Sequence, residues 1–103
     1  MTIPVFVVGA FEHPTRLATD KSVAELHAEV AIGALSDAGI SKNEIDGYFC
    51  ASDAPGIGPL SMIEYMGLNV RYADSTDIGG SSPIAHVGHA VTAIREGKCN
   101  IAL

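Results

Sequence analysis

The sequence has few basic residues, few cysteines and no long apolar run, and each shortage argues against a class of protein. Six Lys and Arg residues stand against twelve Asp and Glu residues, which gives the 103-residue chain a formal net charge of −6. Because no basic cluster can neutralise a phosphate backbone, the composition argues against a nucleic-acid partner. No apolar run reaches the ~18 residues that cross a bilayer. The two cysteines, Cys50 and Cys99, are too few for a disulfide framework and indicate a reducing compartment, the cytoplasm.

What is present is the composition of a single globular domain, with 48% apolar and 17% charged residues. Apolar, β-branched runs predict strands at 3–10, 45–51, 69–77 and 99–103. Between them we predict helices at 23–38, 60–66 and 83–96, and loops at 12–21 and 52–59. The N-terminal run lacks the basic region of a signal peptide, so we interpret it as a buried strand. This alternation is typical of an α/β fold with a mostly parallel sheet and helices on its faces.

Capping signals mark the ends of the first two predicted helices. Ser22 and Glu25 form a capping box, in which each side chain satisfies a free backbone N–H at the start of the first helix. Gly39 predicts the end of this helix in a Schellman turn, and Gly67 predicts the same end for the second helix. A second capping signal at 41–44 predicts a single helical turn.

The last predicted helix is apolar nearly all round. Its apolar residues point in every direction: Ile84, Ala85, Val87, Ala90, Val91, Ala93 and Ile94. A helix of this kind is normally buried on every side inside a larger protein. Since three helices and one sheet cannot enclose it, we expect the functional polypeptide to continue beyond Leu103, or another subunit to cover the helix. Residues 1–103 are then an incomplete domain.

The turn at 79–83 (GGSSP) joins the third predicted strand to this helix and has two interpretations. In one it is a tight connection, with Ser82 as N-cap and Pro83 at the first helical position. In the other, free N–H groups and the helix dipole hold an anion or a developing oxyanion, and the glycines permit its close approach. The position before a buried helix favours the second. Ser81 lies in a G-x-S-x-P pattern near the nucleophile-elbow motif, but the final glycine is missing and too few residues follow for a serine hydrolase.

Two histidines and both cysteines also carry potential chemistry. His86 and His89 lie at i and i+3 on the last helix, and a metal site would need further ligands such as Asp74 and Asp77. We favour a packed, hydrogen-bonded histidine pair, with His86 able to face the cleft formed by the glycine turn. The two cysteines stand at strand ends, away from helix N-termini, so we interpret them as small buried hydrophobes. The first predicted strand lacks the G-x-G-x-x-G pattern of dinucleotide-binding proteins.

Several segments resemble the N-terminal part of the thiolase superfamily. In order they are VFVVGAFEHPTR, SVAELHAEVAIGALSDAGISKNEIDGYF, LSMIEYMGL and GGSSPIAHVGHAVTAIREGKCNIAL. The resemblance is most specific in ALSDAGISKNEIDG and AIREGKCNIAL. It is strongest to the branch of sterol-carrier-protein-type thiolases and lipid-transfer-protein-like enzymes. It implies the N-terminal half of an α/β/α/β/α layered and usually dimeric fold, in which the last helix is a buried central helix.

The resemblance also implies where the reaction centre lies. Thiolases transfer acyl groups between coenzyme A thioesters through a cysteine at the start of this helix. Counting back from Gly97, that position is Gly80 here, followed by Ser81 and Ser82, so the usual nucleophile is absent. The histidine of the family's Gly-His-Pro motif and its second cysteine belong to the half outside this chain, and the segment 88–90 (GHA) is not that motif.

Thiolase-like proteins with glycine in this turn resemble aldolases that cleave a carbon–carbon bond of a coenzyme A thioester with a small acyl-CoA-binding partner. We therefore expect part of a cytoplasmic thiolase-like enzyme of lipid metabolism that acts on acyl-CoA by acyl transfer, as an acetyl-CoA acetyltransferase does, or by retro-aldol cleavage. The candidate cleft residues are Gly80, Ser81, Ser82 and His86. We expect no metal and no permanently bound cofactor, with a coenzyme A thioester as substrate. The expected partner is a second copy in a homodimer or a small acyl-CoA-binding subunit.

Two alternatives come from other functional classes. One is a non-catalytic thiolase-like subunit that scaffolds or activates a catalytic partner, which the glycine at the nucleophile position also fits. The other is a free-standing small α/β binding domain. The last alternative requires a soluble monomer at this length, whereas an incomplete domain exposes apolar surface and associates.

Overall fold

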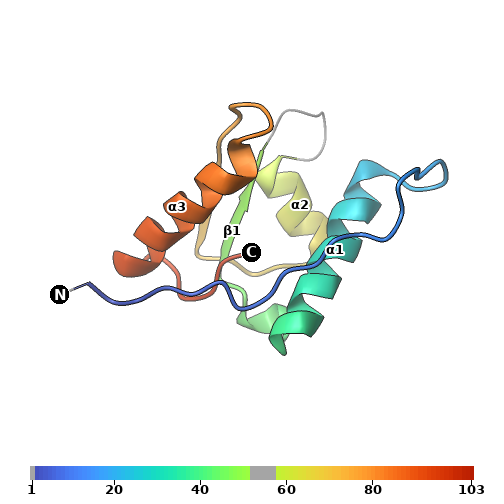
Figure 1. The fold of residues 1–103 in the computed structure, drawn as a ribbon. Helices are drawn as coiled ribbons and strands as arrows, with labels where there is room; N and C mark the ends of the chain where they lie inside the picture. Colours follow the sequence, from blue (N-terminus) through green and yellow to red (C-terminus); the bar gives the residue numbers. More distant parts are fainter. Residues whose placement is uncertain (1, 52–57) are drawn as a thin grey trace.

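The computed structural model of the protein describes residues 2–51 and 58–103. Its elements follow in the order α1 (Val23–Ala38), the 3-10 turn η1 (Lys42–Glu44), β1 (Gly47–Cys50), α2 (Pro59–Met66), β2 (Tyr72–Ser75) and α3 (Ser82–Arg95). In Figure 1, β1 lies between α3 on one side and α2, followed by α1, on the other. The predicted α/β class is thus confirmed, with helices on both sides of a parallel sheet.

The alternation of side chains along β1 builds the core in two halves. Tyr48 and Cys50 point to one face of the sheet, where they pack with Met62 of α2. Phe49 points to the other face and packs against α3 and Cys99. All four residues of β1 are buried, as is typical of a parallel strand covered on both faces.

β1 is the central strand. It pairs in parallel with β2, so that Gly47 stands opposite Tyr72. On its other edge, Leu103 N–H donates to Gly47 O at 3.0 Å, and the last residues of the chain run parallel to β1. The strands predicted at 45–51 and 69–77 are therefore present with shorter bounds. The strand predicted at 99–103 is present only as this short pairing.

The first predicted strand is absent. Residues 2–11 are extended, but they form no backbone hydrogen bond with any strand among the described residues. Their apolar side chains lie at the surface, with Phe6 72% and Val7 78% exposed. The prediction of a buried strand is therefore wrong, because a strand is buried in a sheet only where neighbours pair with its edges and helices cover its faces.

This N-terminal segment is nevertheless fixed to the rest of the molecule. Arg95 Nε donates to Ile3 O at 3.0 Å, and Ala10 N–H donates to Asp37 Oδ2 at 3.0 Å. Between these bonds the segment crosses the molecule from α3 to α1 (Figure 1). A Cβ at Gly9 would stand 2.5 Å from a backbone oxygen of α1, so the segment approaches this helix as closely as only glycine allows.

The predicted ends of the first two helices are confirmed. Ser22 Oγ accepts from Glu25 N–H at 3.1 Å, and Glu25 Oε1 accepts from Ser22 N–H at 3.2 Å, which is the predicted capping box. Left-handed Gly39 and Gly67 end α1 and α2, and the residue after each glycine closes the Schellman bond. The signal at 41–44 forms η1 with a capping box of its own.

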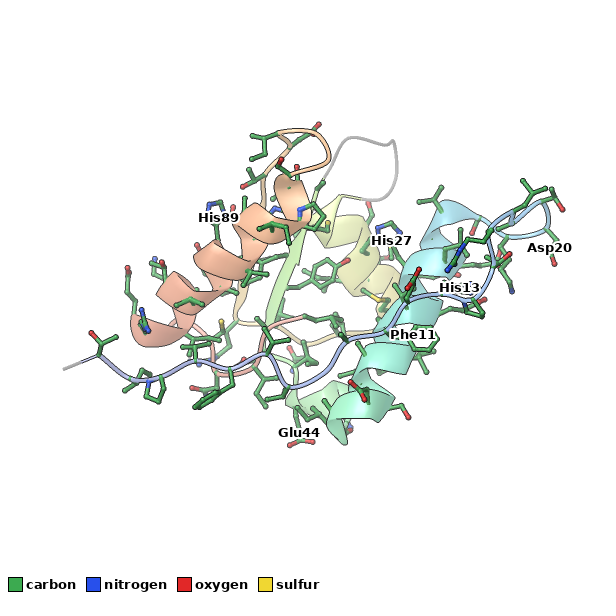
Figure 2. All side chains as sticks on the ribbon, in the orientation of Figure 1. Phe11, His13, Asp20, His27, Glu44 and His89 are labelled. Atoms are coloured by element: carbon green, nitrogen blue, oxygen red, sulfur yellow. The ribbon has the colours of Figure 1, made fainter. Side chains whose placement is uncertain are left out.

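The predicted loop at 12–21 is fixed by side chains. His13 Nε2 lies 2.7 Å from Glu29 Oε1, and Lys21 Nζ donates to Glu29 Oε2 at 2.9 Å. Thr15 N–H donates to His13 Nδ1 at 3.1 Å, so the other ring nitrogen carries the proton shared with Glu29. The bonds from His13 and Lys21 hold the pKa of Glu29 below its ordinary value. Figure 2 shows His13 beside α1. The loop predicted at 52–59 lies mostly outside the described residues.

α3 is covered on one side. Its inner face carries Ser82, His86 and Ala93, which are buried, whereas Ile84 is 76% and Val87 47% exposed. The predicted burial of this helix on every side is therefore not realised within the described residues, because the sheet offers it a single face. No helix in the described ranges is long and apolar enough to span a membrane.

Candidate functional site: the turn before α3

The loop between β2 and α3 carries the candidate residues predicted from the sequence. It leaves the carboxyl end of β2 at Thr76 and turns at Gly79, whose φ of 77° lies in the left-handed region. Ser82 N–H donates to Gly79 O at 3.0 Å and closes the turn. The carboxyl ends of parallel strands are where open α/β sheets place their ligand sites.

Ser82 is fully buried and ties this turn together. Its Oγ donates to Gly79 O at 2.8 Å and accepts from Ile78 N–H at 2.8 Å. Ser82 is the first residue of α3, and the N-cap position is held by Ser81, whose side chain makes no capping bond. The prediction of Ser82 as N-cap is therefore wrong by one residue. Its hydroxyl bonds the preceding loop instead of the free N–H groups of the helix.

His86 lies one turn further along α3 and is 7% exposed. Its Nε2 accepts from Thr76 N–H at 3.1 Å. The ring packs beside Phe49 and His89, with ring centres 6.3 and 6.0 Å away. The packed, hydrogen-bonded histidine predicted from the sequence is confirmed at this position, and its accepting nitrogen is occupied by the loop backbone.

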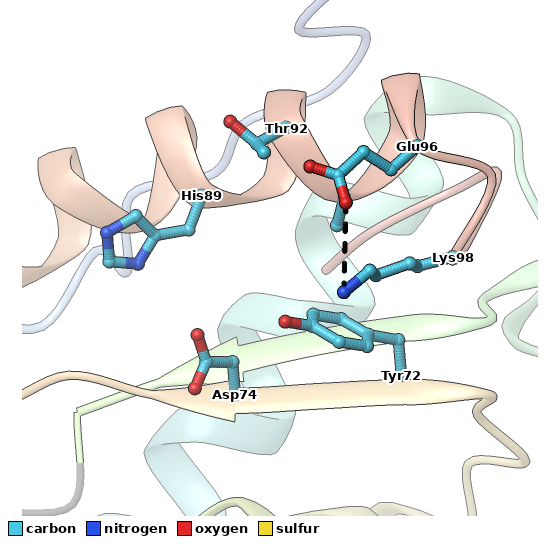
Figure 3. Close-up of a pocket in the computed structure, with 7 residues that line it drawn as sticks. Tyr72, Asp74, His89, Thr92, Glu96 and Lys98 are labelled. Carbon is cyan, nitrogen blue, oxygen red and sulfur yellow. Dashed lines mark ion pairs between the residues drawn. The ribbon is translucent and has the colours of Figure 1, made fainter.

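A cavity of about 220 Å³ lies between α3 and β2 (Figure 3). Its walls come from β2, α3 and the turn that follows α3: Tyr72, Asp74, His89, Thr92, Ala93, Glu96 and Lys98. Lys98 Nζ lies 3.8 Å from Glu96 Oε1 and 5.3 Å from the centre of the Tyr72 ring. Neither the glycine turn nor His86 lines this cavity, so the structure separates it from the predicted cleft.

The residues considered for a metal site in the sequence analysis do not all lie together in the structure. His89 and Asp74 face the cavity from opposite walls (Figure 3). His89 is exposed, and its Nδ1 lies 3.4 Å from Thr76 Oγ1. Asp77 stays in the loop, where its Oδ1 accepts from Gly79 N–H at 3.4 Å. Among the described residues, no group of three or more side chains has the arrangement of a metal site.

Both cysteines are buried in the core, Cys50 to 8% and Cys99 to 0% exposure. Burial raises the pKa of both thiols, and a hydrogen bond with Tyr48 opposes the rise at Cys50. A thiol whose pKa is raised supplies little thiolate at neutral pH. Their prediction as small buried hydrophobes is confirmed.

Gly80 stands at the exposed side of the turn, and a Cβ built there would meet no atom of residues 2–51 or 58–103 within 4 Å. Its backbone lies outside the left-handed region, so other residues fit there without strain. Gly80 lies one residue before the N-cap of α3, at the end of the helix where the dipole is positive. The turn can therefore stabilise negative charge on a neighbouring group, although it holds no cysteine.

Sequence reasoning missed Thr76, whose backbone amide connects the loop to His86. No sequence signal marks this residue, because every amino acid except proline offers the same N–H group. The role of Ser82 was missed for a related reason. A serine that begins a helix predicts a cap, and the alternative partner, the loop backbone, is visible only in the fold.

No protein-family model matches the sequence, and no curated protein is similar to it. The fold is shared with part of a solved aldolase chain. That chain is described as "Ltp2-ChsH2(DUF35) aldolase", and it superimposes with a TM-score of 0.73 at 19% identity over 82% of the present chain. The match covers 22% of the aldolase chain, so the present chain spans less than a quarter of its length. At this identity the likeness establishes a common fold.

Proposed function

We propose that this chain is the N-terminal part of a thiolase-like aldolase, of the lipid-transfer-protein-like branch, that cleaves a carbon–carbon bond of a β-hydroxyacyl-CoA thioester. The observation that carries the proposal is the turn around Gly80. Among the described residues, none stands against a Cβ added to Gly80, and the turn lies at the positive end of α3, yet it holds no cysteine. The likeness of the fold to part of an aldolase chain supports the same reaction class.

Retro-aldol cleavage suits a site without a cysteine, because no bond to the enzyme forms. A base removes the proton of the β-hydroxyl group, the Cα–Cβ bond breaks, and its electron pair moves onto the thioester oxygen as an enolate. The enolate then takes up a proton at Cα. The products are a carbonyl compound and a shortened acyl-CoA. Hydrogen-bond donors and dipoles aimed at the thioester oxygen lower the barrier, and each donor raises kcat by a factor of about 10² to 10³.

In this proposal, the backbone of the turn at 79–82 lines the pocket for the thioester oxygen, and the exposed Ser81 side chain contacts the substrate. Ser82 and His86 are buried and bond the loop, so they act on the turn and not on the substrate. The acid and base come from a part of the enzyme outside residues 1–103. Coenzyme A enters with the substrate, and the enzyme works in the cytoplasm as a homodimer or with a small acyl-CoA-binding subunit.

The test is a cleavage assay with the natural full-length protein and a 3-hydroxyacyl-CoA. We expect equimolar amounts of a carbonyl product and a shortened acyl-CoA, measured by mass spectrometry. The matched control substrate is the same acyl-CoA without the hydroxyl group, which cannot be cleaved in this way. Intact substrate after incubation with the protein and its co-purifying subunits would refute the proposal.

A second candidate is a non-catalytic thiolase-like subunit that scaffolds a catalytic partner. The exposed apolar face of α3, with Ile84 and Val87, favours it because such a surface normally packs against protein. Gly80→Val separates the two candidates. It fills the open side of the turn, so it reduces the cleavage rate if the turn binds substrate. It leaves the rate of the complex unchanged if this chain is only a scaffold.

A further inference from the structure

Two side chains of α3 hold the loop that precedes this helix. His86 Nε2 accepts from Thr76 N–H at 3.1 Å at the start of the loop. Ser82 Oγ accepts from Ile78 N–H and donates to Gly79 O, both at 2.8 Å, near its end. The turn at Gly80 lies directly after these bonds, and a Cβ added to Gly80 would meet no described atom within 4 Å. The bonds from the side chains of α3 therefore fix the direction of the backbone groups in the turn.

The surroundings of His86 allow its side chain to hold the loop but not to reach a substrate as a base. The side chain is 7% exposed, and Phe49 of β1 and His89 of α3 pack beside its ring. Because Nε2 accepts a hydrogen bond from a backbone amide, this nitrogen carries no proton, and the neutral ring holds its proton on Nδ1. A group whose lone pair is used in this way cannot serve at the same time as a base toward a substrate.

We propose that His86 is a positioning residue, which fixes the turn at Gly79–Gly80 through the backbone amide of Thr76 while Ser82 fixes it through Ile78 and Gly79. The inference rests on the proposed function in one respect, that the turn faces the thioester oxygen. It changes the role expected from the sequence, in which His86 faces the cleft. The side chain acts through the loop and does not touch the substrate.

Two substitutions at this position separate positioning from catalysis. In His86→Gln, Oε1 is as many bonds from the main chain as Nε2 of histidine, so the amide keeps its acceptor. In His86→Leu the acceptor is lost and the Thr76 N–H is left without it. His89→Leu is the matched control, since Nδ1 of the exposed His89 lies 3.4 Å from Thr76 Oγ1, whereas the Thr76 amide donates to His86.

The experiment is residue-resolved amide hydrogen exchange of the loop in the protein and these three variants. We expect the Thr76 amide to exchange about tenfold faster or more in His86→Leu, and to stay within about threefold of the original rate in His86→Gln and His89→Leu. Unchanged exchange in His86→Leu, or equal loss in His86→Gln, would overturn the inference. If His86→Leu does not fold, the ¹⁵N shifts of the unaltered protein still decide, because a proton on Nε2 contradicts the inference.

The cleavage assay then separates this inference from the proposed function. If the full-length enzyme cleaves the substrate, His86→Leu lowers kcat with little change in KM, and His86→Gln restores most of the rate. Loss of activity in both variants would identify a catalytic histidine and refute the positioning role. If the unaltered enzyme cleaves nothing, the proposed function fails, while the exchange rates still show whether His86 holds the loop.

Discussion

At the scale of single residues, the contacts of two glycines show how differently the turn and the core are packed. A Cβ at Gly80 would meet no atom within 4 Å in the part of the chain that the structure describes, whereas a Cβ at Gly47 would stand 2.7 Å from Cys99 Sγ. Gly80 is thus free to change without strain, and Gly47 is held by the close packing of β1 against the segment that follows α3. Both positions lead to measurable predictions.

Gly80→Cys is expected to create a fast-reacting thiol without loss of stability. The new side chain is exposed, and the N-terminus of α3 lowers the pKa of a thiol at this place. Burial, in contrast, raises the pKa of Cys50 and Cys99. Iodoacetamide at pH 7 should modify the new cysteine at least about tenfold faster than the two native ones, as followed by intact mass. The unaltered chain is the control, and equal rates at all three thiols would contradict the open turn.

Gly47→Ala is expected to destabilise the protein by about 1 to 3 kcal/mol, because the added methyl group collides with the buried Cys99 side chain. Cys99→Ala removes the colliding sulfur, so the double variant should lose less stability than the two single losses added together. Gly88→Ala is the matched control. Its Cβ meets no described residue within 4 Å and lies inside α3, so this variant should gain about 0.5 to 1 kcal/mol of stability. Urea unfolding measures the stability of the three single variants and the double variant. If the losses of Gly47→Ala and Cys99→Ala simply add in the double variant, the contact between the two positions is disproved.

At the scale of elements, Asp46 joins the start of β1 to the segment that pairs with its edge. Its Oδ1 accepts from the N–H groups of Asn100 and Ile101, both at 2.8 Å, and Arg71 Nη2 donates to its Oδ2 at 3.2 Å. Burial alone would raise the pKa of this carboxyl group. The N–H bonds from Ile101 and Asn100 and the Arg71 guanidinium outweigh burial, and the pKa lies below its ordinary value of 3.8.

We therefore expect Asp46→Asn to lower the stability of the protein by an amount that depends on pH. Because the folded pKa is below the unfolded one, the carboxylate stabilises the protein at pH above about 4 and loses this effect as the pH falls through the folded pKa. The variant should be less stable than the original by about 2 kcal/mol at pH 7, and the difference should shrink as the pH approaches 2. Urea unfolding across this range measures the difference. A difference independent of pH would show that the charge is not involved.

The elements differ in how far the sequence predicts them. The capping box of Ser22 depends only on residues within one turn of Ser22, and the helix end at Gly39 only on residues within about one turn of Gly39. The local sequence therefore determines both. The extended segment 2–11 has the apolar pattern of a buried strand, yet its burial depends on neighbours far away in the chain. The same limit applies to the candidate site. Gly80 and Ser81 are where the turn signals place them, but the bond between His86 and Thr76 requires the packing of α3 on β1.

At the scale of the whole molecule, the exposed apolar surface is the feature that a single copy of this chain does not explain. Ile84 and Val87 lie on the outer face of α3, and Phe6 and Val7 lie on the N-terminal segment. Water contact with such side chains costs free energy in proportion to their area. A net charge of −6 opposes association only over the short screening distance in physiological salt. Contact between apolar faces therefore decides the behaviour of the isolated chain.

We expect the isolated 103-residue chain to self-associate at high micromolar concentration through the outer face of α3. Ile84→Gln combined with Val87→Gln removes apolar area without changing charge, so the monomer fraction in sedimentation velocity should rise. Leu17→Gln is the matched control, because Leu17 is 81% exposed but belongs to the loop before α1. Association driven by apolar contact also strengthens in sulfate and weakens on cooling, whereas charge-driven association weakens with added salt. A chain that stays monomeric, or variants that associate as the original does, would show that the outer face of α3 does not drive association.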